Sequence, residues 1–388
     1  MKKLMVIIPD VLSDIITKGE VIDRYYNPGN YFSEVHLVLT NSDKPDLALV
    51  QKMVGTARLF IYNTFSDKLL FLLSCGWNPW LMRLCLRNTI QLLQAIEPQM
   101  IRCHGASVNV FMASCIKDNC GIPYVVSMHI NPDVDIRGRA AGFVKNVVNN
   151  ARKKVERIGL LNADLVMPVY SPIVSYLEGL GVTQYKICYN VINPKYLCIK
   201  KDYSIGDNVK VISVGRQFAE KNPINLIRAV ARIRNIYLTL VGDGPYHQYL
   251  VDVVEECGVQ DRVFFHKAIP NDELCAMLPN FDIFSTHTEY FEISKSVLEP
   301  LLTGLPVLLN RRIGEAVKEL TSDKCLLVPN TVEAYFSGLN DLIENKSLRE
   351  SMGKAAFSFG QANWLPANTE QKFVSIYMNI IKKAADVK

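Results

Sequence analysis

Several features that would define a class of protein are missing from this 388-residue chain. Its ten cysteines include no Cys-x-x-Cys pair, which argues against a disulfide framework or a zinc site, and their scatter through apolar segments is typical of buried free thiols. No apolar run approaches the ~18 residues that a membrane-spanning helix needs. The net charge of +5 is modest for this length, so the sequence argues against a dedicated nucleic-acid-binding protein.

The amino-terminal residues 1–10, Met-Lys-Lys-Leu-Met-Val-Ile-Ile-Pro-Asp, have an apolar part that is too short for a signal peptide. We interpret them as a first β-strand. No Gly-x-Gly-x-x-Gly follows this strand, so a nicotinamide-dependent dehydrogenase is the weakest alternative for this chain. We expect the protein to be kept in a reducing cytoplasm.

Short runs rich in β-branched residues alternate with longer helical stretches along most of the chain. This rhythm predicts parallel sheets with right-handed crossovers, and the near-continuous apolar strands suit sheets that are covered on both faces. The expected strands are residues 4–8, 34–39, 100–103, 124–128, 165–169 and 186–189 in a first set, and residues 210–214, 237–241, 263–266, 282–285, 307–309 and 325–328 in a second set.

A polar segment at residues 200–208, Lys-Lys-Asp-Tyr-Ser-Ile-Gly-Asp-Asn, separates the two sets of strands. We therefore predict two Rossmann-like, doubly wound α/β domains, at residues 1–200 and 205–365. They are expected to face each other across a cleft that binds the ligand at the carboxyl ends of the strands. The last stretch has helical periodicity, and we expect a helix within residues 366–388 to pack back on the first domain.

The most informative segment is residues 289–307, where a loop with acidic residues leads into a short apolar helix that closes in Gly-Leu-Pro-Val. Glu292 and Glu299 are seven residues apart, close to two helical turns, so their carboxylates can face the same side. Free backbone N–H groups at the expected helix start can bind an anion. The residues at that start are Ser294, Lys295 and Ser296. Such a segment suits a nucleotide-sugar, because amides can take the diphosphate while a carboxylate takes hydroxyl groups.

Two further elements precede this segment. The strand at 210–214 ends in Gly215, and Arg216 and Lys221 follow on the loop. Glycine lets a ligand approach the backbone closely, and two cations can neutralise a diphosphate, although the pair alone also fits a solvated loop. The next strand runs into Gly242-Asp-Gly-Pro, which by itself indicates only a tight turn.

The order of these elements is Gly-Arg-x4-Lys, then Gly-Asp-Gly-Pro, then two acids and Gly-Leu-Pro-Val. Over residues 209–355 this combination resembles the family 4 retaining glycosyltransferases, the glycosyl transferases group 1, which have the GT-B fold. The resemblance implies a nucleotide-diphosphate sugar donor that is bound mainly by the second domain. It implies that Arg216 and Lys221 hold the donor phosphates and that Glu299 bonds the nucleotide ribose. We include Gly215, Gly242 and residues 294–296 in the donor site.

The chain departs from the family pattern at the first acid. The family has this acid eight residues before the second one and follows it with Gly-Phe-Gly, whereas Phe291 occupies that position here. The nearest acids are Glu289 and Glu292. We favour Glu292 as the acid near the sugar and keep Glu289 as the alternative. Glu292 would also suit the positive end of the helix dipole without any role in catalysis.

Weaker signals lie in the first domain. His129 follows the expected strand 124–128, at the place where the resemblance puts a strand-end histidine beside the donor sugar; the alternative is a structural histidine. His104 ends another strand, and Asn131 and Asp133 follow His129; we assign these three to the acceptor side. The alternative for the segment after His104 is a simple helix start with Ser107 as its cap. Residues 19–31 carry aromatic and polar groups that suit a sugar acceptor or an ordered surface loop. The family's amino-terminal glycine-rich loop is absent.

Two stretches suggest a membrane surface. The segment from Arg137 to Arg157 is strongly basic, and the apolar stretch at residues 69–86 contains Trp77 and Trp80. A basic helix beside exposed tryptophans would bind anionic lipid head groups. The alternative is a solvated basic face beside ordinary core packing. We therefore keep an anionic membrane as a candidate partner, with the protein in the cytoplasm or peripheral on the inner face of the cell membrane.

We predict a retaining glycosyltransferase that moves a sugar from a nucleotide-diphosphate sugar to a glycan or lipid-linked glycan in cell-surface polysaccharide synthesis. Because Arg216 and Lys221 can replace a divalent ion, we expect no metal and no other cofactor. We interpret Asp133-Val-Asp135 as an ordinary acidic loop. Two alternatives remain open, a non-catalytic partner subunit that binds sugar nucleotides and a GT-B sugar-nucleotide 2-epimerase.

Overall fold

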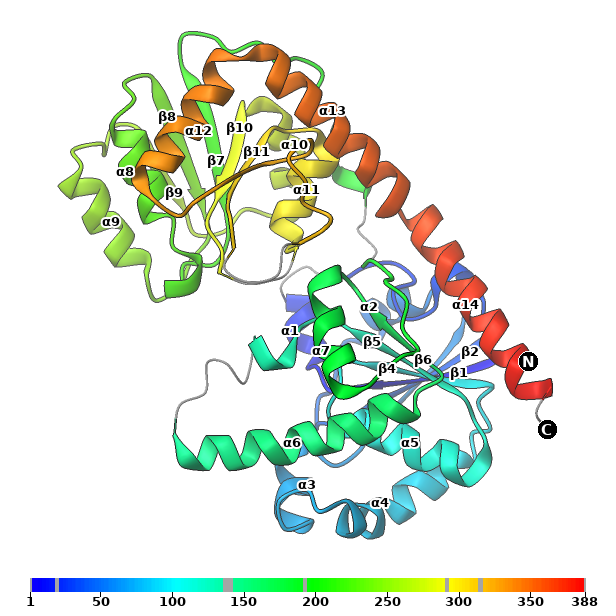
Figure 1. Cartoon of the computed structure of the whole chain (residues 1–388). Coiled ribbons are helices and arrows are strands. Elements are labelled where there is room, and N and C mark those ends of the chain that lie inside the picture. Colours follow the sequence, from blue (N-terminus) through cyan, green and yellow to red (C-terminus); the bar gives the residue numbers. More distant parts are fainter. Residues whose placement is uncertain are drawn as a thin grey trace. The chain divides into compact units, whose positions relative to one another are not determined.

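The computed structural model describes residues 2–17, 21–134, 142–190, 194–289, 293–312 and 317–386. The chain forms two compact units (Figure 1), and each has its own sheet. Unit 1 comprises Met1–Asn193 and Pro366–Lys388, and unit 2 comprises Pro194–Leu365.

The division falls between Asn193 and Pro194, before the polar segment at 200–208 that the sequence favoured as the break. The reason lies in Lys200, which is buried in unit 2. Its backbone N–H donates to the Thr303 carbonyl at 2.8 Å, and its Nζ donates to the Phe281 carbonyl at 2.7 Å. The polar residues from 200 onward are thus part of unit 2.

The sheet of unit 1 has six parallel strands in the order β3-β2-β1-β4-β5-β6. The strands are β1 (Lys3–Ile8), β2 (Glu34–Leu39), β3 (Arg58–Asn63), β4 (Met100–His104), β5 (Tyr124–Met128) and β6 (Leu165–Pro168). The helices are α1 (Leu12–Thr17), α2 (Leu47–Val54), α3 (Asp67–Leu73), α4 (Pro79–Gln94), α5 (Val108–Cys120), α6 (Phe143–Asn162), α7 (Val174–Leu180) and α14 (Pro366–Asp386).

Apolar side chains cover both faces of this sheet. Along β1, Met5 and Ile7 join the core with α3–α7, whereas Leu4, Val6 and Ile8 join a second core with α1, α2 and α14. Successive strand residues point to opposite faces, so a continuous apolar strand requires helices on each side. This is the doubly wound arrangement that the strand composition predicted.

In unit 1, one predicted strand does not form and one strand was not predicted. Residues 186–189 form no regular strand. Beside the single bridge between Val166 and Tyr185, the Lys186 and Cys188 amides donate to the Val166 and Pro168 carbonyls of β6 at 3.0 and 2.9 Å. The sixth strand is instead β3, an edge strand that pairs with β2 and whose ends are exposed. The apolar residues at 186–189 are held by contacts from neighbouring elements, such as that of buried Cys188 with the α14 side of the core.

Side chains mark the starts of several helices. Asp46 accepts hydrogen bonds from the Ala48 and Leu49 amides at the start of α2. Asn78 does the same for α4, whose first residue is Pro79. Such caps satisfy amides that have no partner within the helix, and proline is tolerated at the first position. The sequence thus fixes the helix starts locally, while the core fixes their orientation.

The last helix, α14, belongs to unit 1, as the sequence predicted for this segment. Phe373, Ile376 and Tyr377 enter its second core. Glu370 accepts from Arg24 Nε at 3.1 Å and from the Gly29 amide at 2.9 Å. Figure 1 shows α14 running along unit 1 (red).

Unit 2 has six parallel strands in the order β12-β11-β10-β7-β8-β9. The strands are β7 (Val209–Val214), β8 (Ile236–Val241), β9 (Val263–His266), β10 (Ile283–Thr286), β11 (Val307–Asn310) and β12 (Leu326–Val328). The helices are α8 (Ile224–Ala231), α9 (His247–Glu256), α10 (Asn271–Met277), α11 (Lys295–Thr303), α12 (Val332–Glu344) and α13 (Lys346–Asn363). All six strands that the sequence predicted here are confirmed. Across the residues that the structure describes, no helix is both long and apolar enough to cross a membrane.

Candidate functional site

The first part of the candidate site is the loop after β7, at the carboxyl edge of the sheet in unit 2. Arg216 is exposed, and its guanidinium lies 5.9 Å over the Phe218 ring. Gly215, Lys221 and Thr286 line one small cavity, which brings the β7 loop and the end of β10 together. Ligands of parallel α/β sheets bind at this edge, so both cations lie where a diphosphate would be expected.

Two glycines of this edge have different surroundings. A Cβ on Gly215 would have no neighbour within 4 Å, so its backbone faces open space. A Cβ on Gly242 would lie 1.9 Å from the Gly215 carbonyl oxygen, and Gly242 has a φ of +143°. The Gly242 carbonyl also accepts from Gln217 Nε2 at 2.8 Å. Gly242 therefore lets the β8 turn pack against the β7 loop, and Gly215 leaves room beside it.

The loop after β10 joins the β7 loop through the backbone. The Glu289 amide donates to the Glu220 carbonyl at 2.9 Å, and the Glu289 side chain is exposed. Asn310, at the end of β11, bonds both the amide and the carbonyl of Thr288 at 2.9 Å. Glu292, the favoured first acid, lies outside the described residues, so only Glu289 of the two alternatives has a described position.

His287 was missed in the sequence analysis. It follows β10 directly, is buried, and neither ring nitrogen has a hydrogen-bond partner among the described residues. Burial, assisted by the nearby Arg312 cation, lowers the pKa of His287 to about 4. Its position immediately after a predicted strand, in Ser-Thr-His-Thr-Glu289, was the available signal.

The start of α11 carries Ser294, Lys295 and Ser296, as the sequence predicted. Ser294 is the N-cap residue, yet its hydroxyl bonds the Ser296 hydroxyl at 2.9 Å and not a helix amide. The first amides of a helix have no intrahelical acceptor. The positive end of α11 therefore lacks a side-chain cap within the described residues, and it can receive an anion.

Glu299 lies on the inner side of α11 and is only 3 % exposed. Its Oε1 accepts from Asn271 Nδ2 at 2.9 Å and lies 3.7 Å from Lys295 Nζ. Burial raises the pKa of Glu299, while Lys295 and Asn271 oppose that rise. The carboxylate is thus held in one orientation by α10 and by its own helix, which suits a fixed acceptor for ligand hydroxyls.

In unit 1, His104 and His129 come together at the carboxyl ends of β4 and β5. Their rings are stacked, with centroids 5.1 Å apart and planes at 19°. Desolvation by burial is the main reason that the pKa of His129 is lowered to about 4, and the Arg102 cation makes a smaller contribution. The His129 carbonyl accepts from the Tyr170 hydroxyl at 2.9 Å.

Asn131 and Asp133 lie on the loop after His129. Asn131 is buried; its Oδ1 accepts from the Asp133 amide at 3.1 Å. The Asp133 carboxylate accepts from Lys153 Nζ of α6 at 2.7 Å. These two residues are engaged in holding the loop, and Asp135 lies outside the described residues. Among the residues with described positions, no three His, Cys, Asp or Glu side chains gather as metal ligands would.

The two tryptophans proposed for a membrane surface differ. Trp77 is only 5 % exposed: it packs edge-on against Phe71 at 4.8 Å and lies under the Arg152 guanidinium at 5.3 Å. The prediction of an exposed Trp77 was therefore wrong, because tertiary packing encloses it. Trp80 is 68 % exposed. Arg137 lies outside the described residues, whereas Arg157, at the other end of the proposed basic segment, is exposed on α6.

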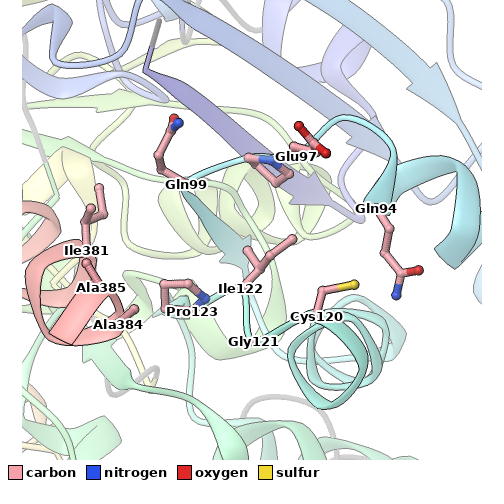
Figure 2. Close-up of a pocket in the computed structure, with 11 residues that line it drawn as sticks. Gln94, Glu97, Gln99, Cys120, Gly121, Ile122, Pro123, Ile381, Ala384 and Ala385 are labelled. Atoms are coloured by element: carbon pink, nitrogen blue, oxygen red, sulfur yellow. The ribbon is translucent and has the colours of Figure 1, made fainter. Parts of the chain in front are cut away.

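A separate pocket of about 470 Å³ lies in unit 1 at the amino ends of β4 and β5. Figure 2 shows it between the loops that precede these strands and α14, with Gln94, Cys120 and Ile381 among its lining residues. None of the residues predicted for the site lines it. Because parallel α/β sheets bind their ligands at the opposite edge, we do not place the active site there.

Part of this chain is similar to a known family of proteins. Residues 199–359 match the model of the glycosyl transferases group 1 family. A GDP-mannose-dependent alpha-(1-6)-phosphatidylinositol monomannoside mannosyltransferase from Mycolicibacterium smegmatis is 28 % identical over 43 % of this chain and 47 % of its own. The aligned part of the chain thus spans about half the length of such curated relatives.

Two solved structures show the fold. Sucrose-phosphate synthase from Thermosynechococcus elongatus is similar with a TM-score of 0.70 and 17 % identity, over 99 % of this chain and 100 % of that one. Anabaena HepE in complex with UDP is similar with a TM-score of 0.70 and 16 % identity, over 98 % of this chain and 100 % of that one. The predicted GT-B fold is confirmed. Residues 199–359, which lie in unit 2, are similar to the glycosyl transferases group 1 family.

Proposed function

We propose that this protein transfers a sugar from a nucleotide-diphosphate sugar to a hydroxyl group, with retention of configuration at the anomeric carbon. The observation that carries the proposal is the hydrogen bond from the Glu289 amide to the Glu220 carbonyl. It joins the loop that carries Arg216 and Lys221 to the loop that leads to the uncapped start of α11. In the proposed site, the two cations and the N-terminus of α11 bind the same anionic group.

In the proposed reaction the bond between the anomeric carbon and the donor phosphate breaks, and the acceptor oxygen attacks from the same face. The electron pair of the broken bond stays on the diphosphate, which takes up the acceptor proton. Arg216, Lys221 and the amides at the start of α11 are proposed to stabilise the charge on this diphosphate. One preorganised donor of this kind contributes on the order of 3 kcal/mol of barrier lowering.

Glu299 is proposed to bond the nucleotide ribose, since a buried carboxylate fixed by Asn271 and Lys295 is a preorganised acceptor. In unit 1, His129 is proposed to orient the donor sugar as a neutral imidazole. Because two cations and helix amides neutralise the diphosphate, we propose that no metal ion is required. The relative with a phosphatidylinositol monomannoside acceptor supports a lipid-linked acceptor in glycan synthesis.

The first test is a thermal-shift screen of the purified protein against UDP-, GDP-, ADP- and CMP-sugars, with and without EDTA. A ligand at 100 times its Kd should stabilise the protein by roughly 2.7 kcal/mol. We expect one nucleotide class to raise the Tm of the wild type, with or without EDTA, and not that of Arg216→Ala. Arg228→Ala, an exposed arginine on the helix after the loop, is the matched control and should keep the shift.

Product analysis then separates the proposal from its rivals. Sugar transfer that depends on an added hydroxyl acceptor, with the donor configuration kept, supports it. Acceptor-independent conversion of the nucleotide-sugar would favour a 2-epimerase. A thermal shift without any conversion of the nucleotide-sugar would favour a non-catalytic partner subunit that binds sugar nucleotides. No thermal shift with any nucleotide-sugar would contradict an active transferase.

We propose in addition that unit 1 docks on anionic lipid through α3 and the first half of α4. The large apolar side chains exposed there, which we call the α3–α4 apolar surface, are Leu69, Leu72, Leu73, Trp80 and Leu84. Such a cluster of exposed apolar side chains marks an interaction site. The sequence of α4 contains Arg83 and Arg87 and no acidic residue, which favours anionic head groups.

Sedimentation with vesicles tests this surface. We expect the protein to bind vesicles that contain phosphatidylglycerol more tightly than vesicles of phosphatidylcholine alone, and Leu72→Ser with Trp80→Ser to abolish that binding. Phe264→Ser, which removes an exposed aromatic side chain of unit 2, is the control and should bind as the wild type does. Equal binding by the wild type and the double variant would contradict the docking surface and leave the proposed sugar transfer untouched.

A further inference from the structure

The end of β4 contains an unusual buried cation. Arg102 is only 2 % exposed, and its Nε donates to Ser127 Oγ at 3.1 Å while NH1 donates to the Tyr25 carbonyl at 3.1 Å. The guanidinium also lies 4.7 Å from the Phe373 ring of α14. Its contacts to described residues are to neutral groups, and the described part of the chain supplies no carboxylate that pairs with it. A buried charge without an opposite partner is rare unless it has a function.

The neighbours of this cation are the two stacked histidines at the same strand ends. His104 lies two residues after Arg102 on β4, and its ring also contacts those of Tyr25 and Tyr26, with centroids 5.3 and 5.0 Å away. Arg102 lowers the pKa of both histidines in addition to the larger effect of burial. The other titratable or polar groups around the three residues are Asp10 (through Tyr26), Tyr377, Asn190 and Cys188.

Each histidine has one nitrogen with no hydrogen bond. Nε2 of His104 and Nε2 of His129 are both shielded from solvent and have no partner among the described residues. Leaving such a buried polar atom unpaired costs about 1–3 kcal/mol. The backbone at Gly105, the next residue, faces open space, because a Cβ there would have no neighbour within 4 Å. The described residues therefore leave both nitrogens without a hydrogen bond, and open space begins at Gly105, the residue after His104.

The chemistry of the pair selects the ligand. A neutral imidazole Nε2 either donates or accepts a hydrogen bond, according to its tautomer. A hydroxyl group can pair with either tautomer, because it both donates and accepts. Arg102 is already bonded to Ser127, Tyr25 and Tyr377, so it is not directed at an anionic ligand. A metal ion would need further ligands, and no group of three forms among the residues with described positions. A ligand with several hydroxyl groups fits best.

We infer that His104 is a second carbohydrate-binding histidine of unit 1, and that Arg102 is a positioning residue that keeps the His104–His129 pair stacked and uncharged. The inference rests on the proposed sugar transfer and adds to it a residue that hydrogen-bonds hydroxyl groups of the sugar. A neutral pair also suits a reaction in which positive charge grows at the anomeric carbon, because an imidazolium there would repel that charge.

Histidine-selective NMR tests the charge of the pair without any activity. The chain has only six histidines, so the ring signals of His104 and His129 can be assigned with His104→Phe and His129→Phe. In the wild type we expect both to stay neutral from pH 8 to 5.5. Arg102→Lys should preserve this, and in Arg102→Met at least one of them should begin to titrate at a higher pH than in the wild type. A charged His104 at pH 6 in the wild type would overturn the inference.

Two controls keep this result interpretable. His36, which bonds Glu34 on β2, should titrate alike in the wild type and in both Arg102 variants if they are folded. If Arg102→Met does not fold, the wild type and Arg102→Lys still decide the outcome, because the pair must be neutral in both.

Ligand titration tests the carbohydrate contact. UDP-glucose and GDP-mannose are compared with UDP and GDP, which lack the sugar, and with methyl α-D-glucoside and methyl α-D-mannoside. We expect the His104 ring signal to move with a sugar-bearing probe and not with the nucleotide alone. Movement with the nucleotide-sugar assigns the donor sugar, and movement with a glycoside assigns an acceptor-like sugar. No movement with any sugar would overturn the inference.

Kinetics separate this inference from the proposed function. His104→Phe keeps a flat ring but removes Nε2, and we expect about a tenfold loss of kcat/KM while UDP or GDP still stabilises the protein. Arg102→Met should shift the acid limb of the pH profile upward, which loss of a purely structural contact would not do. If His104→Phe matches the wild type in kcat, KM and pH profile, the role of His104 is refuted and the proposed transfer stands.

Discussion

At the scale of single residues, Gly215 and Gly242 show how two glycines in one motif can have different physical roles. Gly242 is required by the fold, since a side chain there would collide with the Gly215 carbonyl. Gly215 is not required by the fold, because the space above its Cα is open. An open position at the end of a parallel strand is where a ligand approaches the backbone.

The pair gives a matched prediction. We expect Gly242→Ala to lower the free energy of unfolding by at least about 2 kcal/mol, through backbone strain and the clash with Gly215. Gly215→Ala should unfold at nearly the same urea concentration as the wild type but lose most of the thermal shift given by the nucleotide-sugar. A Gly215→Ala protein that binds the donor normally would place the donor elsewhere.

A second prediction concerns pH. His287 is 3 % exposed, and its pKa is about 4, against an ordinary value of 6.5. Between these two pH values His287 is therefore protonated in the unfolded chain and neutral in the folded chain. Between pH 6.5 and 4 the unfolded state therefore binds more protons, and stability falls as the pH falls, by up to about 3 kcal/mol for this residue. We expect Tm to fall over this window, and less steeply in His287→Gln. Parallel Tm curves for the two proteins would show that His287 is not held neutral.

Residue roles were only partly accessible from the sequence. Gly215, Arg216 and Lys221 lie on one loop at the end of a strand. The alternation of strands and helices along the sequence is enough to predict this position. The burial of Trp77 was not accessible, because it depends on a turn with a φ of +57° and on Arg152, far away in sequence. Glu299 accepts a hydrogen bond from Asn271 of α10, and no local sequence pattern predicts this partner.

At the scale of elements, strands were predicted well where they are central and apolar. β1 and β7 are continuous runs of apolar residues that only a doubly covered sheet accommodates. β3 was missed although its interior, Leu-Phe-Ile-Tyr, consists largely of strand-forming residues; its exposed ends and partly buried interior fit its place at the edge of the sheet. Residues 186–189 have strand-like composition and lie beside β6, but only Lys186 and Cys188 donate backbone hydrogen bonds to it, which is too little to extend the sheet by a regular strand.

The anchoring of α14 gives a prediction at this scale. Glu370 is 9 % exposed and bonds both Arg24 and the Gly29 amide, so removing its charge leaves these donors without their acceptor. We expect Glu370→Gln to lower the free energy of unfolding of unit 1 by about 1–2 kcal/mol, as judged by urea denaturation. Arg83→Gln, which breaks an exposed pair with Asp118 within the same unit, should change it by less than about 0.5 kcal/mol. Equal effects would mean that α14 is held by apolar packing alone.

At the scale of the whole molecule, the two units differ in how the chain builds them. Unit 2 is one continuous stretch, and its main core contains no residue of α14. Unit 1 is discontinuous, and α14 contributes Phe373, Ile376, Tyr377 and Ile380 to one of its two cores. Each such side chain stabilises by about 1.5–3 kcal/mol when buried.

We therefore expect truncation after Leu365 to affect the units unequally. Hydrogen exchange should show lost protection in β1 and β2 of unit 1, while β7 and β8 of unit 2 keep theirs. The loss of four core side chains is enough to unfold a domain of ordinary stability. Equal loss of protection in both units, or none in either, would contradict this division of the stability.

The place of α14 in the chain also has a consequence for synthesis. The ribosome makes β1 before unit 2 and α14 after it, so the apolar face formed by Leu4, Val6 and Ile8 stays uncovered by α14 while unit 2 is being made. Unit 2 can fold as it emerges, whereas unit 1 is completed only after α14 has been made. A ribosome that stalls within unit 2 would thus leave a nascent chain whose first strands are exposed to chaperones and proteases.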